Sequence, residues 1–287
     1  MCAGAWGEGS SGGKRGGFGR GVCLTLRRVR ILGLPIGRPD EQQGRNVEAF
    51  RERHRPMAAV IVLLVLLEGV ATLVLAAAVG FDLSAAAHFG SLLDRGPGAA
   101  ELLRWGALLD MASYLAFGLV VLYIGEQLWP SNALVVASLT LSGLGAVLIG
   151  AVGAVLLATV GPSLLLDYAT ASASAREAAR VALDALGQGV AAGLWGTLEL
   201  TMLGAWLIGV GWLLRREWSR FGGLAMLSGI GMMASGLRTG ATGRIIVEVS
   251  GPLDLVIVLV ILGSLVLLFV WLVWLGIRLW RGQPAGP

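Results

Sequence analysis

Repeated apolar runs of twenty or more residues, separated by short polar gaps, constrain this chain more than any other feature of its sequence. The first run, AAVIVLLVLLEGVATLVLAAAVGF at residues 58–81, contains a single charged residue. A helix of about 20 apolar residues crosses the ~30 Å hydrocarbon core of a bilayer, whereas a soluble core has no use for several such runs. Only 14% of the chain is charged, against about 25% in soluble domains. The pattern predicts an all-α, polytopic membrane helix bundle.

Six runs have the length expected of transmembrane helices. The fifth is short and rich in glycine, and it gives the weakest signal. Before the fourth run, SAREAARVALDALGQ has the periodicity of an amphipathic helix, which predicts either a short interfacial helix in the third internal loop, residues 161–188, or an extension of the next span. The predicted spans are residues 58–81, 102–122, 133–160, 190–214, 221–237 and 255–275.

Residues 1–56 differ from the rest of the chain, because they are polar, rich in glycine and arginine, and of low complexity. We expect a disordered tail here, and Met57, which opens the first apolar run, is an alternative start. The membrane domain is then residues 57–281, followed by a short tail at 282–287. Both cysteines, Cys2 and Cys23, fall in the first tail. They therefore predict neither a disulfide in the membrane domain nor a zinc site with the histidines.

The basic residues carry topology information. The chain has 22 Lys+Arg against 18 Asp+Glu, but 11 of the 22 lie in residues 1–56 and most others flank apolar runs. We therefore expect a lipid bilayer as the partner and no nucleic acid. Six spans place both termini on one side, and the arginines of RREWSR and of the C-terminal end favour the cytoplasmic side. The prediction is a multi-pass protein of the bacterial inner (plasma) membrane.

Three carboxylic acids lie inside predicted spans: Glu68, Asp110 and Glu199. An acid at this depth costs about 2.5–3.5 kcal/mol on insertion scales, which makes each a functional candidate. The spans contain no lysine, arginine or histidine at mid-depth, and burial without a positive partner favours the neutral acid. Such acids suit proton coupling or cation passage. The alternative is a purely structural hydrogen bond to a neighbour such as Ser113.

Five further polar or aromatic residues are candidates for a supporting role. Tyr114 and Thr197 lie within one helical turn of an acid and carry hydroxyl donors. Trp195 precedes Glu199 by one turn, where it either lines a pocket or only packs. Arg104 and Arg238 lie near span ends, where they either reach an acid or extend to the membrane surface.

Rows of small residues, four apart, run along two of the predicted spans. Such rows allow helix backbones to approach closely. They predict a packing seam within the monomer, or alternatively a homo-oligomer interface. The rows are Ser142, Ala146, Gly150 and Ala154 in the third span, and Gly193, Thr197, Thr201, Ala205 and Gly209 in the fourth.

Catalytic motifs are missing from the sequence, which has no HExxH, GxSxG, P-loop or CxxC pattern. We therefore assign no catalytic, cofactor-binding or metal-binding residue. The first hypothesis is a small transporter or channel-like protein that uses the three acids for a small solute, protons or cations. The second is a non-catalytic membrane regulator or assembly component. The third is an intramembrane enzyme acting on lipid, which would need a water-accessible polar cluster near one interface.

Two stretches, ELLRWGALLDMASYLAFGLVVLY and GLWGTLELTMLGAWLIGVGWLLRR, carry a family resemblance. From about Met57 to Arg281 the chain resembles a bacterial family of six-span membrane proteins that is defined as a domain of unknown function. The resemblance covers Asp110 in the second span and Glu199 after the Gly-Leu-Trp of the fourth. It implies the fold and the membrane location and brings no activity with it.

Overall fold

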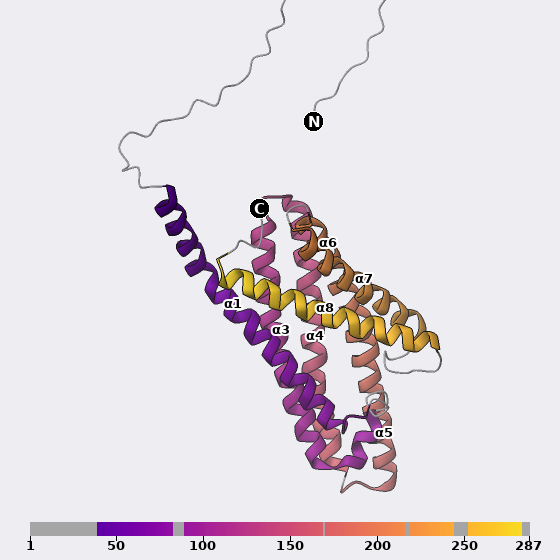
Figure 1. The fold of residues 1–287 in the computed structure, drawn as a ribbon. Coiled ribbons are helices and arrows are strands. Elements are labelled where there is room, and N and C mark those ends of the chain that lie inside the picture. The colour runs from indigo at the N-terminus through magenta and orange to yellow at the C-terminus, as the bar shows by residue number, and fades with distance from the viewer. Residues whose placement is uncertain (1–38, 83–88, 169, 216–217, 244–251, 283–287) are drawn as a thin grey trace, which may run out of the picture.

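The computed structural model describes residues 39–82, 89–168, 170–215, 218–243 and 252–282. These residues are almost all helical and include no strand (Figure 1). The elements are α1 (Pro39–Ala78), the 3-10 helix η1 (Phe89–Arg95), α3 (Pro97–Leu128), α4 (Ala133–Tyr168), α5 (Ala173–Gln188), the π-helix η2 (Gly189–Glu199), α6 (Leu200–Leu214), α7 (Ser219–Thr242) and α8 (Pro252–Trp280).

Five of the described helical stretches are long and apolar enough to cross a membrane, which confirms an all-α protein built from such helices. The predicted fifth span is present as α7, but it is not among these five. Its many glycines, serines and threonines reduce its hydropathy. The five are His54–Ala78, Pro97–Leu128, Ala133–Leu166, Ala173–Leu214 and Leu255–Trp280.

The first helix begins earlier than expected. Helix α1 starts at Pro39 and continues through Pro56, so it begins 19 residues before the predicted first span. His54 is buried, and its Nδ1 lies 2.9 Å from the hydroxyl of Tyr123 on α3. The packed part of the chain therefore begins before Met57. The rest of the predicted tail, residues 1–38, lies outside the described residues.

The segment before the fourth span is helical as well. Helix α4 continues through Pro162 to Tyr168, which shortens the predicted loop. Ser172 then caps α5, because its hydroxyl accepts a hydrogen bond of 3.3 Å from the N–H of Ala175. Helix α5 runs without a break into η2 and α6, and together they form one stretch of 42 residues. The amphipathic segment is therefore an extension of the fourth span rather than a separate loop helix.

The helices pack so that the first and last meet. Helix α3 packs against α1 and α4, α6 packs against α7, and α8 packs against α1 and α7 (Figure 1). The guanidinium of Arg55 lies 5.7 Å from the centre of the Trp280 ring. A side chain at Gly276 would touch Ile61. The beginning of the first apolar stretch and the end of the last one therefore lie at the same end of the bundle.

Small residues mark the closest helix contacts. A methyl group at Gly204 would lie 2.7 Å from the carbonyl oxygen of Gly229, and one at Gly222 would lie 2.5 Å from that of Gly211. Helices α6 and α7 thus touch backbone to backbone. The predicted row on α4 also faces other helices of the same chain, because Gly150 is covered by the Tyr114 ring and Ala146 and Ala154 are buried. On η2 the row is partly open, since nothing lies within 4 Å of a methyl group at Gly193.

The described residues form two hydrophobic cores, one toward each end of the bundle. The first core contains an aromatic cluster, in which the Trp206 ring lies 5.5 Å from Phe117 and 6.1 Å from Trp271. Near the C-terminal end of α8, Trp271 is completely buried in this cluster, whereas Trp280 is 53% exposed.

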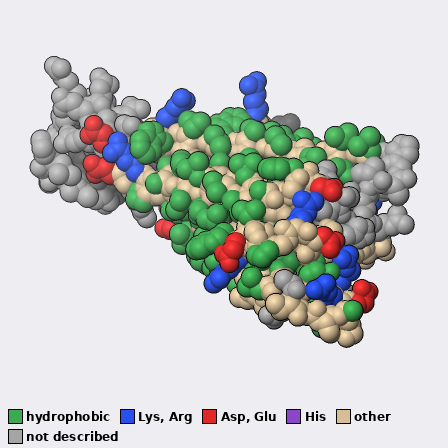
Figure 2. Space-filling model, turned by 90° about the horizontal axis from the view of Figure 1, so that it is seen from below, with side chains coloured by type: hydrophobic (Ala, Val, Ile, Leu, Met, Phe, Trp, Pro, Cys, Tyr) green, Lys and Arg blue, Asp and Glu red, His purple; other side chains and the backbone are tan. Residues whose placement is uncertain are grey.

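The second core lies beneath η1. Phe89, Leu92 and Leu93 are buried there against α3, α4 and α5. The carboxylate of Asp184 accepts a hydrogen bond of 2.6 Å from the N–H of Gly90 and so ties η1 to α5. Over the rest of the visible surface, hydrophobic side chains cover most of the described part and charged side chains form separate small groups (Figure 2).

Candidate functional site

The three intramembrane acids lie in the layer between the two hydrophobic cores. On α1, Glu68 lies between Leu64 of the first core and Ala78 of the second. On α3, Asp110 lies between Ala116 of the first core and Ala107 of the second. The order along both helices is therefore apolar core, acid, apolar core. The polar layer is enclosed by packed hydrophobic residues toward each end of the bundle.

Glu199 has the corresponding place on the fourth stretch. It is the last residue of η2, between Val190 of the second core and Leu200 of the first. Glu199 is 9% exposed and Asp110 is 6% exposed, whereas Glu68 is only half-buried. Two of the acids are therefore enclosed by the bundle, and the third reaches its outer surface.

Glu68 and Asp110 are direct neighbours across the contact between α1 and α3. Their carboxyl groups are within hydrogen-bonding reach of each other. The hydroxyl of Ser113 donates to Glu68 Oε2 at 2.6 Å and also approaches the backbone carbonyl of Asp110 at 2.8 Å. Ser113 therefore links α1 to α3 beside the two acids.

Glu199 joins this group through Tyr114. The phenol hydroxyl of Tyr114 donates toward both carboxylate oxygens of Glu199, at 2.9 Å and 2.8 Å. Tyr114 directly follows Ser113 on α3. Two adjacent residues therefore donate hydrogen bonds to acids on two different helices, α1 and η2. Glu199 is also close enough to interact electrostatically with Asp110 and Glu68. The structure therefore brings all three predicted acids into one polar layer.

The helix that carries Glu199 has an unusual winding. Eleven residues, Gly189–Glu199, form a π-helix between the α-helical segments α5 and α6. Long π-helical segments are rare, and short ones are frequent at functional sites. The hydroxyl of Thr197 donates to the carbonyl oxygen of Ala192, five residues earlier, at 2.6 Å. This side-chain bond follows the i to i−5 spacing of the π-helix and supports the backbone immediately before Glu199.

Two of the other predicted supporting residues bond to the backbone rather than to the acids. The indole N–H of Trp195 donates to the backbone carbonyl of Gly150 at 3.1 Å, so Trp195 joins η2 to α4. The Thr197 hydroxyl is engaged with the backbone of its own helix. Arg104 is exposed at the surface of α3, and Arg238 is half-buried near the end of α7. The partners of the acids are hydroxyl groups and one another.

Two features of this site were not predicted from the sequence. The π-helix has no reliable sequence signal, although its three glycines (Gly189, Gly193 and Gly196) are a weak one. The contact between Glu68 and Asp110 depends on how far α1 is shifted along α3, which no local pattern specifies. Within the described ranges, no three His, Cys, Asp or Glu side chains are arranged to hold a metal ion.

The fold and the site define a class: an all-helical protein with several membrane-length helices around an internal layer of carboxylic acids. The helices have the length and composition of membrane-spanning helices, as in an integral membrane protein. Comparison of the chain with family models, curated proteins and solved structures gives no match.

Proposed function

We propose that this protein is a membrane transporter that conducts protons, in which Glu68, Asp110 and Glu199 bind the proton. The observation that supports this proposal is the enclosed polar layer, in which three acids and two hydroxyl groups lie between two hydrophobic cores. A binding layer that is closed toward both ends is what an occluded transporter requires. Intramembrane acids are costly, and they commonly mark ion or proton pathways.

The chemistry of the layer suits a proton. Each of the three acids can bind and release a proton. Two of them accept hydrogen bonds from hydroxyl groups, Glu68 from Ser113 and Glu199 from Tyr114. The hydroxyls of Ser113 and Tyr114 can each donate and accept. Binding or loss of a proton would rearrange these hydrogen bonds and change the contacts among α1, α3 and η2.

We further propose that α7 is a sixth membrane crossing. Its 24 residues would extend about 36 Å as an α-helix. The contact between Arg55 and Trp280 supports this count, because it brings the start of the first stretch and the end of the last to one end of the bundle. An even number of crossings is needed for that. The proposal includes cytoplasmic termini in a bacterial inner membrane and membership of the six-span family that the sequence resembles.

The test is proton flux into vesicles that contain the purified full-length protein and a pH-sensitive dye. Under an imposed potassium diffusion potential, Asp110→Asn and Glu199→Gln should abolish the flux, because both keep the side-chain shape but cannot exchange a proton. Glu101→Gln is the matched control, since Glu101 is an exposed acid at the start of α3. Wild-type flux in both site variants would refute the proposal.

A second readout separates transport from a structural role. If the acids only hold the helices together, the site variants should lose thermal stability and folded yield in proportion to any loss of flux. That result would favour the non-catalytic regulator or assembly component. Folded, stable variants without flux would support the transporter.

A further inference from the structure

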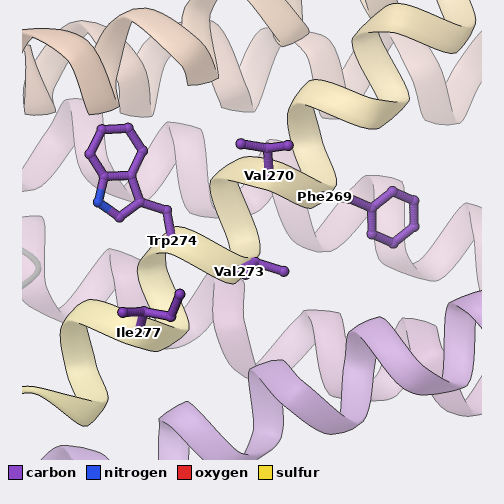
Figure 3. Close-up of a pocket in the computed structure, with 5 residues that line it drawn as sticks. All are labelled: Phe269, Val270, Val273, Trp274 and Ile277. Atoms are coloured by element: carbon purple, nitrogen blue, oxygen red, sulfur yellow. The ribbon is translucent and has the colours of Figure 1, made fainter.

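The outward face of α8 carries an apolar groove near its C-terminal end. The groove is shallow and open, with a volume of about 420 Å³, and Val270 and Val273 are 47% and 44% exposed. Figure 3 shows the side chains of Phe269 and Trp274 pointing to opposite sides of the helix, with the smaller residues between them. All the residues that line it are apolar: Phe269, Val270, Val273, Trp274 and Ile277.

The groove continues into a basic and aromatic end. The N–H of Arg281 donates to the carbonyl of Ile277 at 3.0 Å, so the helical turn continues and Arg281 follows Ile277 on the same face. Trp280, beside it, is 53% exposed, and the guanidinium of Arg55 lies 5.7 Å from the centre of its ring. Arg278 stacks on the Trp218 ring at 3.8 Å. Three arginines from α1 and the end of α8 are thus gathered at one end of an apolar groove.

The last part of the chain carries no aspartate or glutamate after Asp254. Helix α1 carries two exposed acids, Glu48 and Glu52, within two turns before Arg55. Tryptophan and arginine are typical of the depth at which a membrane helix leaves the hydrocarbon and meets the lipid headgroups. The groove therefore runs along the hydrocarbon region, and the arginines lie at its headgroup end.

We propose that this groove binds one acyl chain of an anionic glycerophospholipid, whose phosphate is held by Arg281 and Arg55. The apolar lining matches the chain, and the arginines match a negative headgroup near the membrane surface. A second copy of this protein is a poorer match. A two-fold axis along the membrane normal would place the same arginines of both copies at the same depth, where they would repel each other.

The experiment measures lipid retention by the purified, delipidated full-length protein with native mass spectrometry. The probes are dioleoyl phosphatidylglycerol, which is anionic, and dioleoyl phosphatidylcholine, which is neutral overall. Wild-type protein should retain the anionic lipid preferentially. Arg281→Ala should weaken its retention about fivefold, as expected for one arginine at a membrane surface, and should leave the neutral lipid unchanged. Arg104→Ala, an exposed arginine elsewhere on the bundle, is the matched control.

A second pair of variants tests the groove itself. Val273→Trp should fill it and release the lipid, whereas Leu259→Trp, at a site on the same helix that is 60% exposed, should not. Both positions face outward, so neither change disturbs the core. Equal retention of the two lipids, or a Val273→Trp variant that binds as well as Leu259→Trp, would overturn the proposal. So would a shift from dimer to monomer in Val273→Trp, which would identify the groove as a contact between copies.

Discussion

Two adjacent glycines of α7 provide a sharp test of the contact between α6 and α7. The three atoms nearest to a methyl group at Gly222 would all be backbone atoms: the carbonyl oxygen of Gly211 at 2.5 Å, the nitrogen of Arg215 at 2.6 Å and its Cα at 2.8 Å. A methyl group at Gly223 would meet nothing within 4 Å. The two substitutions to alanine have the same chemistry on the same helix and differ only in what the new methyl group contacts.

The expected difference follows from these distances. Replacing glycine by alanine in a helix gains about 0.5–1 kcal/mol of intrinsic stability at either position. At Gly222 the backbone of α6 cannot move aside as a side chain would, so the helices must separate until the contact is an ordinary one. Overpacking of this kind costs about 1–3 kcal/mol. Gly222→Ala should therefore be less stable than Gly223→Ala by that amount.

The assay is thermal unfolding of the two variants and the wild type in the same detergent, followed by loss of the monodisperse peak in size-exclusion chromatography. For a chain of this size, 1 kcal/mol corresponds to roughly 2–4 °C in Tm. Gly222→Ala should therefore melt several degrees below Gly223→Ala, which should equal or exceed the wild type. Equal melting of the two variants would refute the close backbone contact between α6 and α7.

Three further changes test other contacts. Tyr114→Phe removes the hydroxyl that donates to Glu199; we expect a loss of about 1–2 kcal/mol in the free energy of unfolding and reduced proton flux, measured in the same vesicles. Trp271→Phe should cost only about 1 kcal/mol, because within the described chain its buried indole N–H has no hydrogen-bond partner to lose; a much larger drop in Tm would contradict this. Asp184→Ala should release η1 by removing the acceptor for the Gly90 N–H, at a cost of about 1–3 kcal/mol, whereas Asp184→Asn keeps an acceptor; hydrogen exchange at Gly90 distinguishes the two.

The sequence was sufficient to predict which segments are helical and apolar, because these properties are local. Continuous apolar runs predict membrane-length helices wherever they pack. The same reasoning was less successful at predicting where each helix begins and ends. Pro56 and Pro162 are natural places to end a helix, yet α1 and α4 continue through both. Burial of His54 against Tyr123 shows that packing extends α1 beyond its apolar run.

Contacts between segments that are distant in the chain could not be predicted from local sequence patterns. A tryptophan near the end of a span is most often interfacial, but Trp271 is enclosed by Trp206 and Phe221, which only the arrangement of α6, α7 and α8 determines. The three acids could be selected individually, because each is expensive at its depth. Their shared layer depends on the relative shift of α1, α3 and η2. The π-helical winding just before Glu199 influences that shift without a clear sequence signal.

The contact between the first and last helices sets the order in which the protein can be completed. Helix α1 leaves the ribosome first and α8 last. Among the described helices, α1 makes its extensive contacts with α3 and α8. Ile61 packs beside Gly276, which lies more than two hundred residues later in the chain. This contact therefore cannot form until nearly the whole protein has been synthesised. The nascent bundle stays open along one side until the final helix arrives. A chain that ends before Pro252 would keep that side exposed, and membrane quality-control proteases could recognise it as unfinished.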